Sequence, residues 1–173
     1  MKRPETKVIW AAAVSAVVLV LALWLGFARP NARRAELDAS QGQVAAQDEA
    51  LSEREEFVGA WAPSIDAFNA GYPLEGYGAA FAEAAYDFGV DPRLSPAIAR
   101  VESGSGQNYA YACNAWGWGT ASWGDWESAI YAHVEGLATN YGTELDWGMA
   151  ARYCPEHPDD WYAQVEGCMA QMG

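Results

Sequence analysis

Residues 97–106 read AIARVESGSG, and after seven further residues NAWGWG follows at residues 114–119. The apolar positions leading into the first stretch have the spacing of one helix face: Leu94, Ile98 and Val101. Gly104 is the residue type that ends helices, because glycine adopts the left-handed backbone of a C-terminal cap without steric cost. The pattern predicts a helix whose last turn carries Glu102, followed by an irregular loop over residues 104–124.

Helical spacing recurs on both sides of this stretch. The residues expected on buried helix faces are Phe81, Ala84, Ala85 and Phe88, then Trp126, Ile130, Val134, Leu137 and Tyr141, and finally Trp161, Val165, Met169 and Met172. Gly89 and Gly142 follow the first two sets, and a shorter helix is expected over residues 147–153. No segment alternates apolar and polar residues long enough to predict a strand. The sequence therefore predicts a compact all-α domain.

Composition excludes two classes of protein. The chain has 173 residues, a net charge of −13 and 51% hydrophobic residues, including nine Trp, nine Tyr and five Phe. These large side chains suffice for a core and exclude a disordered acidic chain. Residues 57–173 contain only three basic side chains beside fifteen acidic ones. Since such a surface cannot neutralise phosphates, we exclude nucleic acid as a partner.

Residues 8–28 carry no charge, and a helix of this length would cross a hydrocarbon core of roughly 30 Å. A cleaved signal peptide is the alternative, but its apolar region usually has about 7–15 residues and ends in a small-residue cleavage site. We therefore predict a retained membrane anchor over residues 8–28, after a basic segment at residues 1–7. Basic residues flank both ends of the apolar run, so the positive-inside rule leaves its orientation open.

Residues 29–56 form a connector rich in Ala, Gln, Glu and Asp, without an aromatic residue. Apolar residues recur every seven positions at Leu37, Val44, Leu51 and Val58, but the complementary row is polar: Gln41, Asp48 and Glu55. A coiled coil needs both rows to be apolar. We expect a solvated, partly helical stalk that holds the domain of residues 57–173 away from the membrane.

The three cysteines, Cys113, Cys154 and Cys168, all lie in the domain of residues 57–173. Outside the cytoplasm they could form one disulfide and leave one thiol. The sequence does not determine the pairing, and we take Cys113 with Cys154 because this bond would tie the loop to the start of the last helix. A zinc site that includes His157 is disfavoured, since the spacing matches no common zinc pattern. We expect no metal and no cofactor.

Glu102 has a setting that suits acid catalysis. On a helix it shares a face with Ser95 and Ala99, beside the apolar stripe. Partial burial disfavours the charged carboxylate, and the C-terminal end of the helix dipole acts in the same direction. Both effects raise the pKa, as a general acid near neutral pH requires. The alternative is that Glu102 is a surface residue at a frayed helix end. The motifs that follow Glu102 distinguish the two interpretations.

The order of the motifs closely resembles the glucosaminidase branch of the lysozyme-like superfamily, which includes bacterial cell-wall hydrolases. The family motif is an apolar helix that ends in Glu-(Ser/Thr)-x-x-Gly, a variable loop, and then Asn-x-(Phe/Trp)-Gly. Later family segments are similar to SWGDWESAI at residues 122–130, to Tyr153-Cys154-Pro155 and to Trp161-Tyr162-Ala163. The resemblance covers roughly residues 74–172 and implies a lysozyme-like helical domain, α+β at most.

The resemblance also implies roles for single residues. Glu102 would be the catalytic acid, and Tyr153 would face the cleaved bond, with Tyr141 as the second choice for that position. The substrate-binding residues would be Ser103, Asn114, Trp116, Trp118 and Tyr141. Ser103 would orient the carboxyl group, and flat aromatic rings stack well on sugars. The structural alternative is that the tryptophans near this loop belong to the hydrophobic core.

The resemblance fails at the second carboxylate that glycoside hydrolysis usually needs. Family members often carry it on a hairpin after the Asn-x-x-Gly motif, but only two residues separate Gly119 from Ser122 here. Asp125 and Glu127 are the nearest candidates. Asp125 has the spacing of a helix cap, and Glu127 is expected to be exposed. A single-carboxylate mechanism, as in the related lytic transglycosylases, therefore stays open.

We expect a single-pass, membrane-anchored peptidoglycan hydrolase that cleaves β-1,4 bonds between amino sugars, with its C-terminal domain outside the cell. The alternatives are a lytic transglycosylase of the same fold and a non-catalytic wall-binding or scaffold module. The acidic charge favours the module, because the wall is itself anionic. No phosphate-binding glycine loop or Gly-x-Ser-x-Gly elbow supports another class, and His133 is expected to pack in the core.

Overall fold

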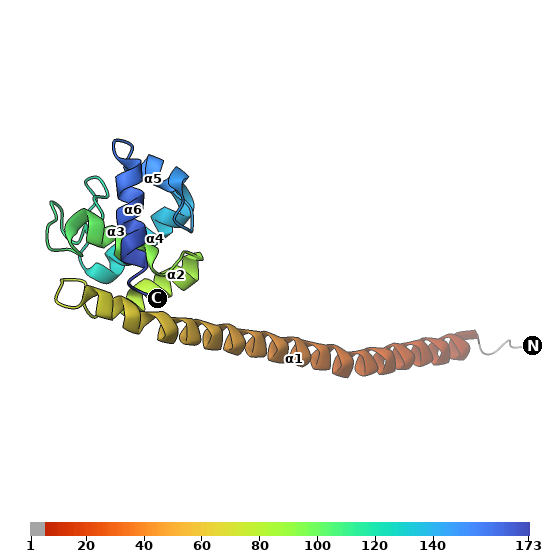
Figure 1. The fold of residues 1–173 in the computed structure, drawn as a ribbon. Coiled ribbons are helices and arrows are strands. Elements are labelled where there is room, and N and C mark those ends of the chain that lie inside the picture. The colour runs from red at the N-terminus through yellow and green to blue at the C-terminus, as the bar shows by residue number, and fades with distance from the viewer. Residues whose placement is uncertain (1–5) are drawn as a thin grey trace, which may run out of the picture. The chain divides into compact units, whose positions relative to one another are not determined.

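The computed structural model describes the backbone of residues 6–173 and the side chains of residues 33–173. This part of the chain contains helices and no strand, which confirms the all-α class. The helices are α1 (Thr6–Asn69), α2 (Gly78–Phe88), α3 (Leu94–Ser103), α4 (Trp126–Asn140), α5 (Trp147–Tyr153) and α6 (Pro158–Met169) (Figure 1). Among the residues with described side chains, no helix contains a stretch that could span a bilayer. The anchor predicted over residues 8–28 lies outside those residues.

The chain divides into two compact units, Met1–Ala50 and Leu51–Gly173. In the first unit, residues 33–50 are helical and exposed. Leu37 and Val44 keep 59% and 57% of their surface open to solvent, so this part of the seven-residue apolar row is not buried. The stalk is continuously helical over residues 33–50, whereas the sequence predicts a partly helical segment.

The second unit begins with residues 51–69 of α1, a helical stretch that the patterns above do not predict. Its signal is the helical spacing of Phe57, Trp61, Ile65 and Phe68. Ile65 and Phe68 enter the core. Arg54 pairs with Asp87 at 2.9 Å and with Glu83 at 3.2 Å, which fastens this part of α1 to α2.

The helix ends lie close to where their residue types predict them. Gly89 and Gly104 cap α2 and α3 in left-handed backbone, with φ of 66° and 65°. Asp125 caps α4 and Asp146 caps α5, each through a side-chain oxygen that accepts a backbone N–H. Helix α6 begins at Pro158, earlier than Trp161, because proline fits the first helical turn, where its missing N–H is not needed.

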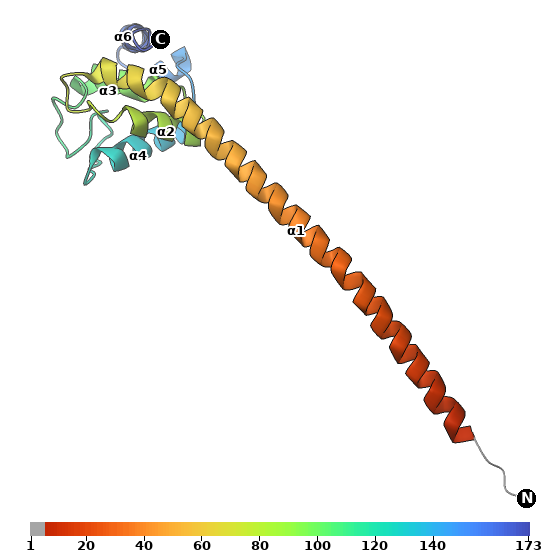
Figure 2. The same ribbon diagram turned by 90° about the horizontal axis from the view of Figure 1, so that it is seen from below.

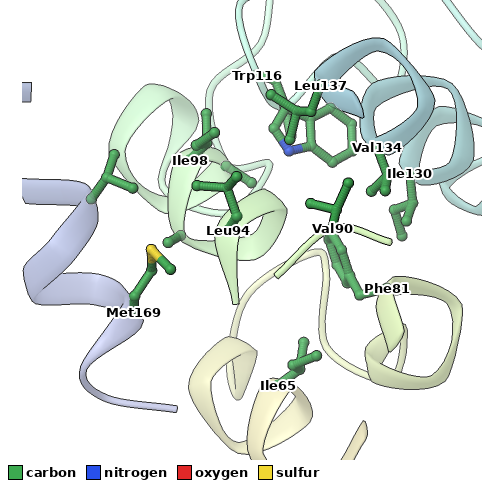
Figure 3. Packing of buried hydrophobic residues seen from close by; sticks show 14 of the residues in the cluster. Ile65, Phe81, Val90, Leu94, Ile98, Trp116, Ile130, Val134, Leu137 and Met169 are labelled. Atoms are coloured by element: carbon green, nitrogen blue, oxygen red, sulfur yellow. The ribbon is translucent and has the colours of Figure 1, made fainter. Parts of the chain in front are cut away.

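Helix α3 lies at the centre of the second unit. It packs against α4 and α6, while α2 packs on α4 and α5 on α6 (Figure 2). Leu94 and Ile98 are fully buried among side chains that include Trp116 of the loop after α3 and Met169 of α6 (Figure 3). Truncating a buried Leu or Ile to Ala typically destabilises a protein by about 2–5 kcal/mol. Glu102 therefore stands at the end of a rigidly held helix.

Candidate active site

The backbone around Glu102 is held from several directions. Arg100, on the same helix, stacks over the rings of Phe68 and Tyr72 with its guanidinium 4.3 and 3.9 Å from their centroids. Its Nε donates to Oγ of Ser105 at 2.8 Å, which ties the loop after α3 to the helix. These contacts join the end of α1, the end of α3 and the following loop. The turn that carries Glu102 is therefore a fixed point of the fold.

Ser103 has a structural role in this turn. Its hydroxyl donates to the carbonyl of Ala99 at 3.0 Å and accepts from the N–H of Gly106 at 2.9 Å. Both bonds lie inside the buried turn, so the hydroxyl is committed to the backbone. The predicted role of Ser103 at the carboxyl group of Glu102 or toward substrate has no counterpart in these bonds and stays a prediction.

The carboxyl group of Glu102 is oriented by two neighbours. Oε1 accepts a hydrogen bond from Nε1 of Trp161 at 2.8 Å. A β-carbon added at Gly117 would stand 3.3 Å from Oε2, so only a glycine at this position leaves the second oxygen its present space. The residue as a whole is exposed, but the surroundings of its carboxyl group raise the pKa through burial, against the opposing effect of the Trp161 bond. The group therefore keeps its proton to a higher pH than an ordinary Glu.

A cavity of about 330 Å³, called here the aromatic cavity, has Gly117 in its wall. Its lining residues are Gly117, Trp118, Gly119, Tyr141 and Tyr153. The ring centroids of Trp118 and Tyr141 lie 5.5 Å apart, and those of Tyr141 and Tyr153 lie 5.2 Å apart. Gly117 contributes to the cavity wall, and a β-carbon on it would meet Glu102, so the structure places three of the predicted aromatic residues near the predicted acid.

Helix α4 makes room for this arrangement. A β-carbon at Gly136 would stand only 2.6 Å from the ring of Trp118. Glycine in the middle of a helix is normally unfavourable relative to alanine by about 1 kcal/mol. The close approach of Trp118 explains its presence, because any larger residue would push the ring towards the cavity.

Tyr153 links the cavity to Glu102 through Trp161. Its hydroxyl donates to the carbonyl of Trp116 at 2.8 Å, and its ring stacks on Trp161 with centroids 4.8 Å apart and planes 23° apart. Burial raises the pKa of Tyr153 well above its usual range, and the charge of Glu102 adds to this shift. The phenol therefore stays protonated at neutral pH. The sequence places Trp161 on a buried helix face but gives no sign of its bond to Glu102, since no local pattern connects residues 59 positions apart.

Two predicted groove residues lie inside the protein. Trp116 is fully buried and donates from Nε1 to the carbonyl of Ser95 at 3.0 Å. Asn114 is also buried, and its side chain bonds to the N–H of Trp118 and to the carbonyl of Ala121. Both residues support the loop from within, and their predicted contact with substrate stays a prediction.

Two residues, Asp125 and Glu127, are candidates for the second carboxylate. In the described part of the chain, neither contacts Glu102. Asp125 is the N-terminal cap of α4, where Oδ1 accepts from the N–H of Ser128 at 2.7 Å. These bonds hold the pKa of Asp125 below its ordinary value. Glu127 is exposed, as expected. The predicted capping role of Asp125 is confirmed, with Asp125 itself as the cap residue.

The expected disulfide is not formed. Cys113, Cys154 and Cys168 are free thiols. Cys113 lies in the loop near Asp125, and Cys168 lies on α6 near Arg100, so the fold places these thiols in different surroundings. Burial raises the pKa of both. In the described part of the chain, no group of three or more His, Cys, Asp or Glu side chains is placed to hold a metal ion.

A larger cavity of about 420 Å³ shares no lining residue with the aromatic cavity. It is lined by aromatic residues of α1 and α2 and by the segment after α2, including Trp61, Tyr86 and Arg93. Asp91, its acidic neighbour, is paired with Arg93 at 2.6 Å. We place the candidate active site at the smaller cavity, because its wall combines three partly exposed aromatic rings with Gly117, which lies near an oriented carboxyl group with a raised pKa.

Comparisons of the chain with protein-family models, with curated proteins and with solved structures found no match.

Proposed function

We propose that residues 57–173 form a lysozyme-like domain that cleaves β-1,4 bonds between the amino sugars of peptidoglycan. The observation that carries the proposal is the setting of Glu102. One carboxyl oxygen accepts from Trp161, the other lies near Gly117 of the aromatic cavity, and burial raises the pKa of the group. A protonated, oriented carboxylic acid next to stacking surface is what a glycosidase needs to protonate a leaving oxygen.

The aromatic cavity suits a sugar ring. Trp118, Tyr141 and Tyr153 offer flat faces for the apolar side of the ring. Glu102 would donate its proton to the oxygen of the scissile bond, and that bond would break as positive charge develops on the sugar. Tyr153 stays a neutral phenol, so it would contribute position and a polar oxygen rather than a charge.

Cleavage could use two carboxylates or only Glu102. The role of Asp125 as a helix cap supports the mechanism with a single carboxylate. A hydrolase with two carboxylates needs a base or nucleophile within about 5–10 Å of the acid. Asp125 is engaged in capping α4 and Glu127 is exposed. The alternative of a lytic transglycosylase, in which groups of the sugar itself complete the reaction and leave an anhydro product, is thereby favoured over a two-carboxylate hydrolase.

The proposed location follows from the sequence of the N-terminal part. An apolar anchor over residues 8–28 would hold the protein in the cell membrane, and the stalk would present the domain to peptidoglycan strands outside the cell. A protease added to intact cells should then degrade residues 57–173. Protection of this domain would contradict the proposed orientation.

The direct test is product analysis. Purified full-length protein incubated with isolated cell walls should release muropeptides with new reducing ends if it is a hydrolase, or anhydro ends if it is a transglycosylase. Binding without any product would support the wall-binding module and overturn the enzymatic proposal.

Glu102→Gln should abolish turnover while wall binding persists. The substitution keeps the shape and the acceptor for Trp161 but removes the transferable proton, and general acid catalysis typically contributes about 10²–10⁴-fold. Glu127→Gln is the matched control, since it makes the same chemical change at an exposed residue. Wild-type turnover of Glu102→Gln in the product assay would exclude Glu102 as the acid.

A further inference from the structure

A buried chain of hydrogen bonds runs behind the aromatic cavity. Oγ of Ser95 lies 2.9 Å from Nδ1 of His133, and Nε2 of His133 lies 3.4 Å from the hydroxyl of Tyr153. The Tyr153 hydroxyl in turn donates to the carbonyl of Trp116 at 2.8 Å. Ser95 belongs to α3, His133 to α4 and Tyr153 to α5, so the chain connects three helices and the loop.

The direction of every bond in this chain follows from its last member. A carbonyl oxygen can only accept, so the proton of Tyr153 points to Trp116. The Tyr153 oxygen must then accept from Nε2–H of His133. This fixes the tautomer, because a neutral imidazole with its proton on Nε2 accepts at Nδ1, and Ser95 is the donor there.

His133 is well suited to hold this position. It is fully buried, its ring stacks on Trp116 at 4.6 Å, and the edge of Trp118 meets it at 4.8 Å. Burial holds the pKa of His133 well below its ordinary value, so the imidazole is neutral. Both nitrogens have partners, and the aromatic neighbours restrict rotation of the ring.

We propose that His133 is a positioning residue for the candidate active site: its Nε2–H holds the Tyr153 hydroxyl against the carbonyl of Trp116, and this sets the place of Gly117 beside Glu102. No proton moves along the chain. The inference rests on the proposed function for its activity test, while the bond directions can be measured without any activity.

The physical reason lies in what the Trp116 carbonyl controls. The next residue, Gly117, lies directly beside Oε2 of Glu102 and lines the aromatic cavity. Tyr153 also supports Trp161, which holds Oε1. Losing the His133 donor would release Tyr153, and with it both supports of the carboxyl group. A displacement of about 1 Å at such a site can reduce turnover by as much as roughly a hundredfold.

Three substitutions of His133 distinguish the contribution of its Nε2–H donor from that of ring packing. His133→Gln places an amide N–H near the position of Nε2, whereas His133→Asn places its amide near Nδ1 and cannot reach Tyr153. His133→Phe keeps the stacking on Trp116 and removes both bonds. On a soluble amino-sugar oligomer, we expect kcat to fall roughly ten- to a hundredfold for the Asn and Phe variants, with KM nearly unchanged. The Gln variant should retain kcat within about threefold of the wild type.

A wild-type kcat for His133→Phe, or an equal loss for all three variants, would overturn the proposal. The second result would mean that the ring matters for packing and not for its donor. Failure of the proposed function is distinguishable, since active Glu102→Gln protein would exclude the site itself, whereas inactive Glu102→Gln with fully active His133→Phe would exclude only the positioning role.

The tautomer provides the second readout, on the unmodified protein. Histidine side-chain ¹⁵N–¹H correlation spectra at neutral pH distinguish an imidazole with its proton on Nε2 from one with its proton on Nδ1. We expect His133 as the Nε2–H form, with a proton slow to exchange because the ring is buried. An Nδ1–H form, or a doubly protonated ring at neutral pH, would overturn the proposal whatever the variants do.

Discussion

At the scale of single residues, the same burial that raises the pKa of Glu102 works against the folded state when the carboxyl group is ionised. Burial raises the pKa of Glu102 in the native protein, whereas the unfolded chain has the ordinary value near 4.3. Above both values the folded state must hold a carboxylate that it disfavours, so ionisation lowers stability. Below the unfolded pKa the group is protonated in both states, and this penalty disappears.

Glu102→Gln should therefore melt at a higher temperature than the wild type at pH 7. The gain should shrink as the pH falls through the folded pKa, and vanish below the unfolded pKa of about 4.3. Thermal unfolding followed by circular dichroism over this pH range is the measurement. Glu127→Gln, at an exposed position, should show little change at any pH. A lower melting temperature for Glu102→Gln at pH 7 would show that the ionised form is favoured by the fold.

Gly117 allows a sharper test of the contact with Glu102. Its φ of 65° disfavours other residues, and a β-carbon would stand 3.3 Å from Oε2 of Glu102. Gly89 has a nearly identical φ of 66° but open space around it. Alanine in left-handed backbone is unfavourable by about 1–2 kcal/mol, so both Gly→Ala variants should lose similar stability.

Only Gly117→Ala should lose turnover, because only there does the new methyl group displace the acid. Chemical denaturation measures the stability of the two variants, and muropeptide release measures their activity. Equal activity of Gly117→Ala and Gly89→Ala would mean that the carboxyl group tolerates displacement and that its contact with the loop is unimportant.

At the scale of elements, Asp125 is the N-terminal cap of α4 and also a candidate for the second carboxylate. Its side chain accepts the N–H of Ser128, which satisfies one of the free donors of the first helical turn. Asp125→Ala should lower the melting temperature and leave kcat close to that of the wild type, whereas a catalytic base would show the opposite. Thermal melting and product release on the same preparation distinguish the two. Retained stability with lost turnover would make Asp125 part of the reaction.

The helix ends were predictable because they depend on local chemistry. Gly89 and Gly104 cap their helices in left-handed backbone, which few other residues adopt, and Asp125 carries the oxygen that a free N–H requires. The helical stretch over residues 51–69 was missed although its apolar spacing is regular. It follows a long polar connector without a break, so no start signal separates the two.

The candidate site was predictable only in part. Trp118, Tyr141 and Tyr153 line one cavity, and Glu102 lies near Gly117 of its wall, but Trp116 and Asn114 are buried. A tryptophan beside glycine in a loop has the same sequence signature whether its ring faces a groove or the core, and packing against His133 decides the direction. The partnership of Trp161 with Glu102 depends on the contact of α3 with α6, which no local pattern encodes.

At the scale of the whole molecule, the site forms only when the second unit is complete. Glu102 comes from α3, Trp161 from α6, Tyr153 from α5 and His133 from α4. These residues meet over a core in which α3 contacts both α4 and α6. Any change that loosens the docking of α6 would therefore release the carboxyl group before the remaining helices unfold.

The net charge of this domain affects the rate at which it approaches its proposed substrate. Residues 57–173 carry fifteen acidic and three basic side chains, and a peptidoglycan wall is also anionic. Like charges slow the approach of a protein to its target, and salt screens this repulsion. The screening length falls from about 30 Å at 0.01 M salt to about 8 Å at 0.15 M.

The release of muropeptides from isolated walls should therefore become faster as the salt concentration rises from 0.01 to about 0.15 M. The measurement needs a substrate control, because salt could also act on the catalytic groups. A short, uncharged amino-sugar oligomer feels no long-range repulsion, so its cleavage should change little over the same range. If walls and oligomer respond alike, charge acts within the site and not on the approach. If wall digestion slows with salt, a local basic contact must dominate, and Arg93, Arg100 and Arg152 are the cations of this domain from which it would have to come.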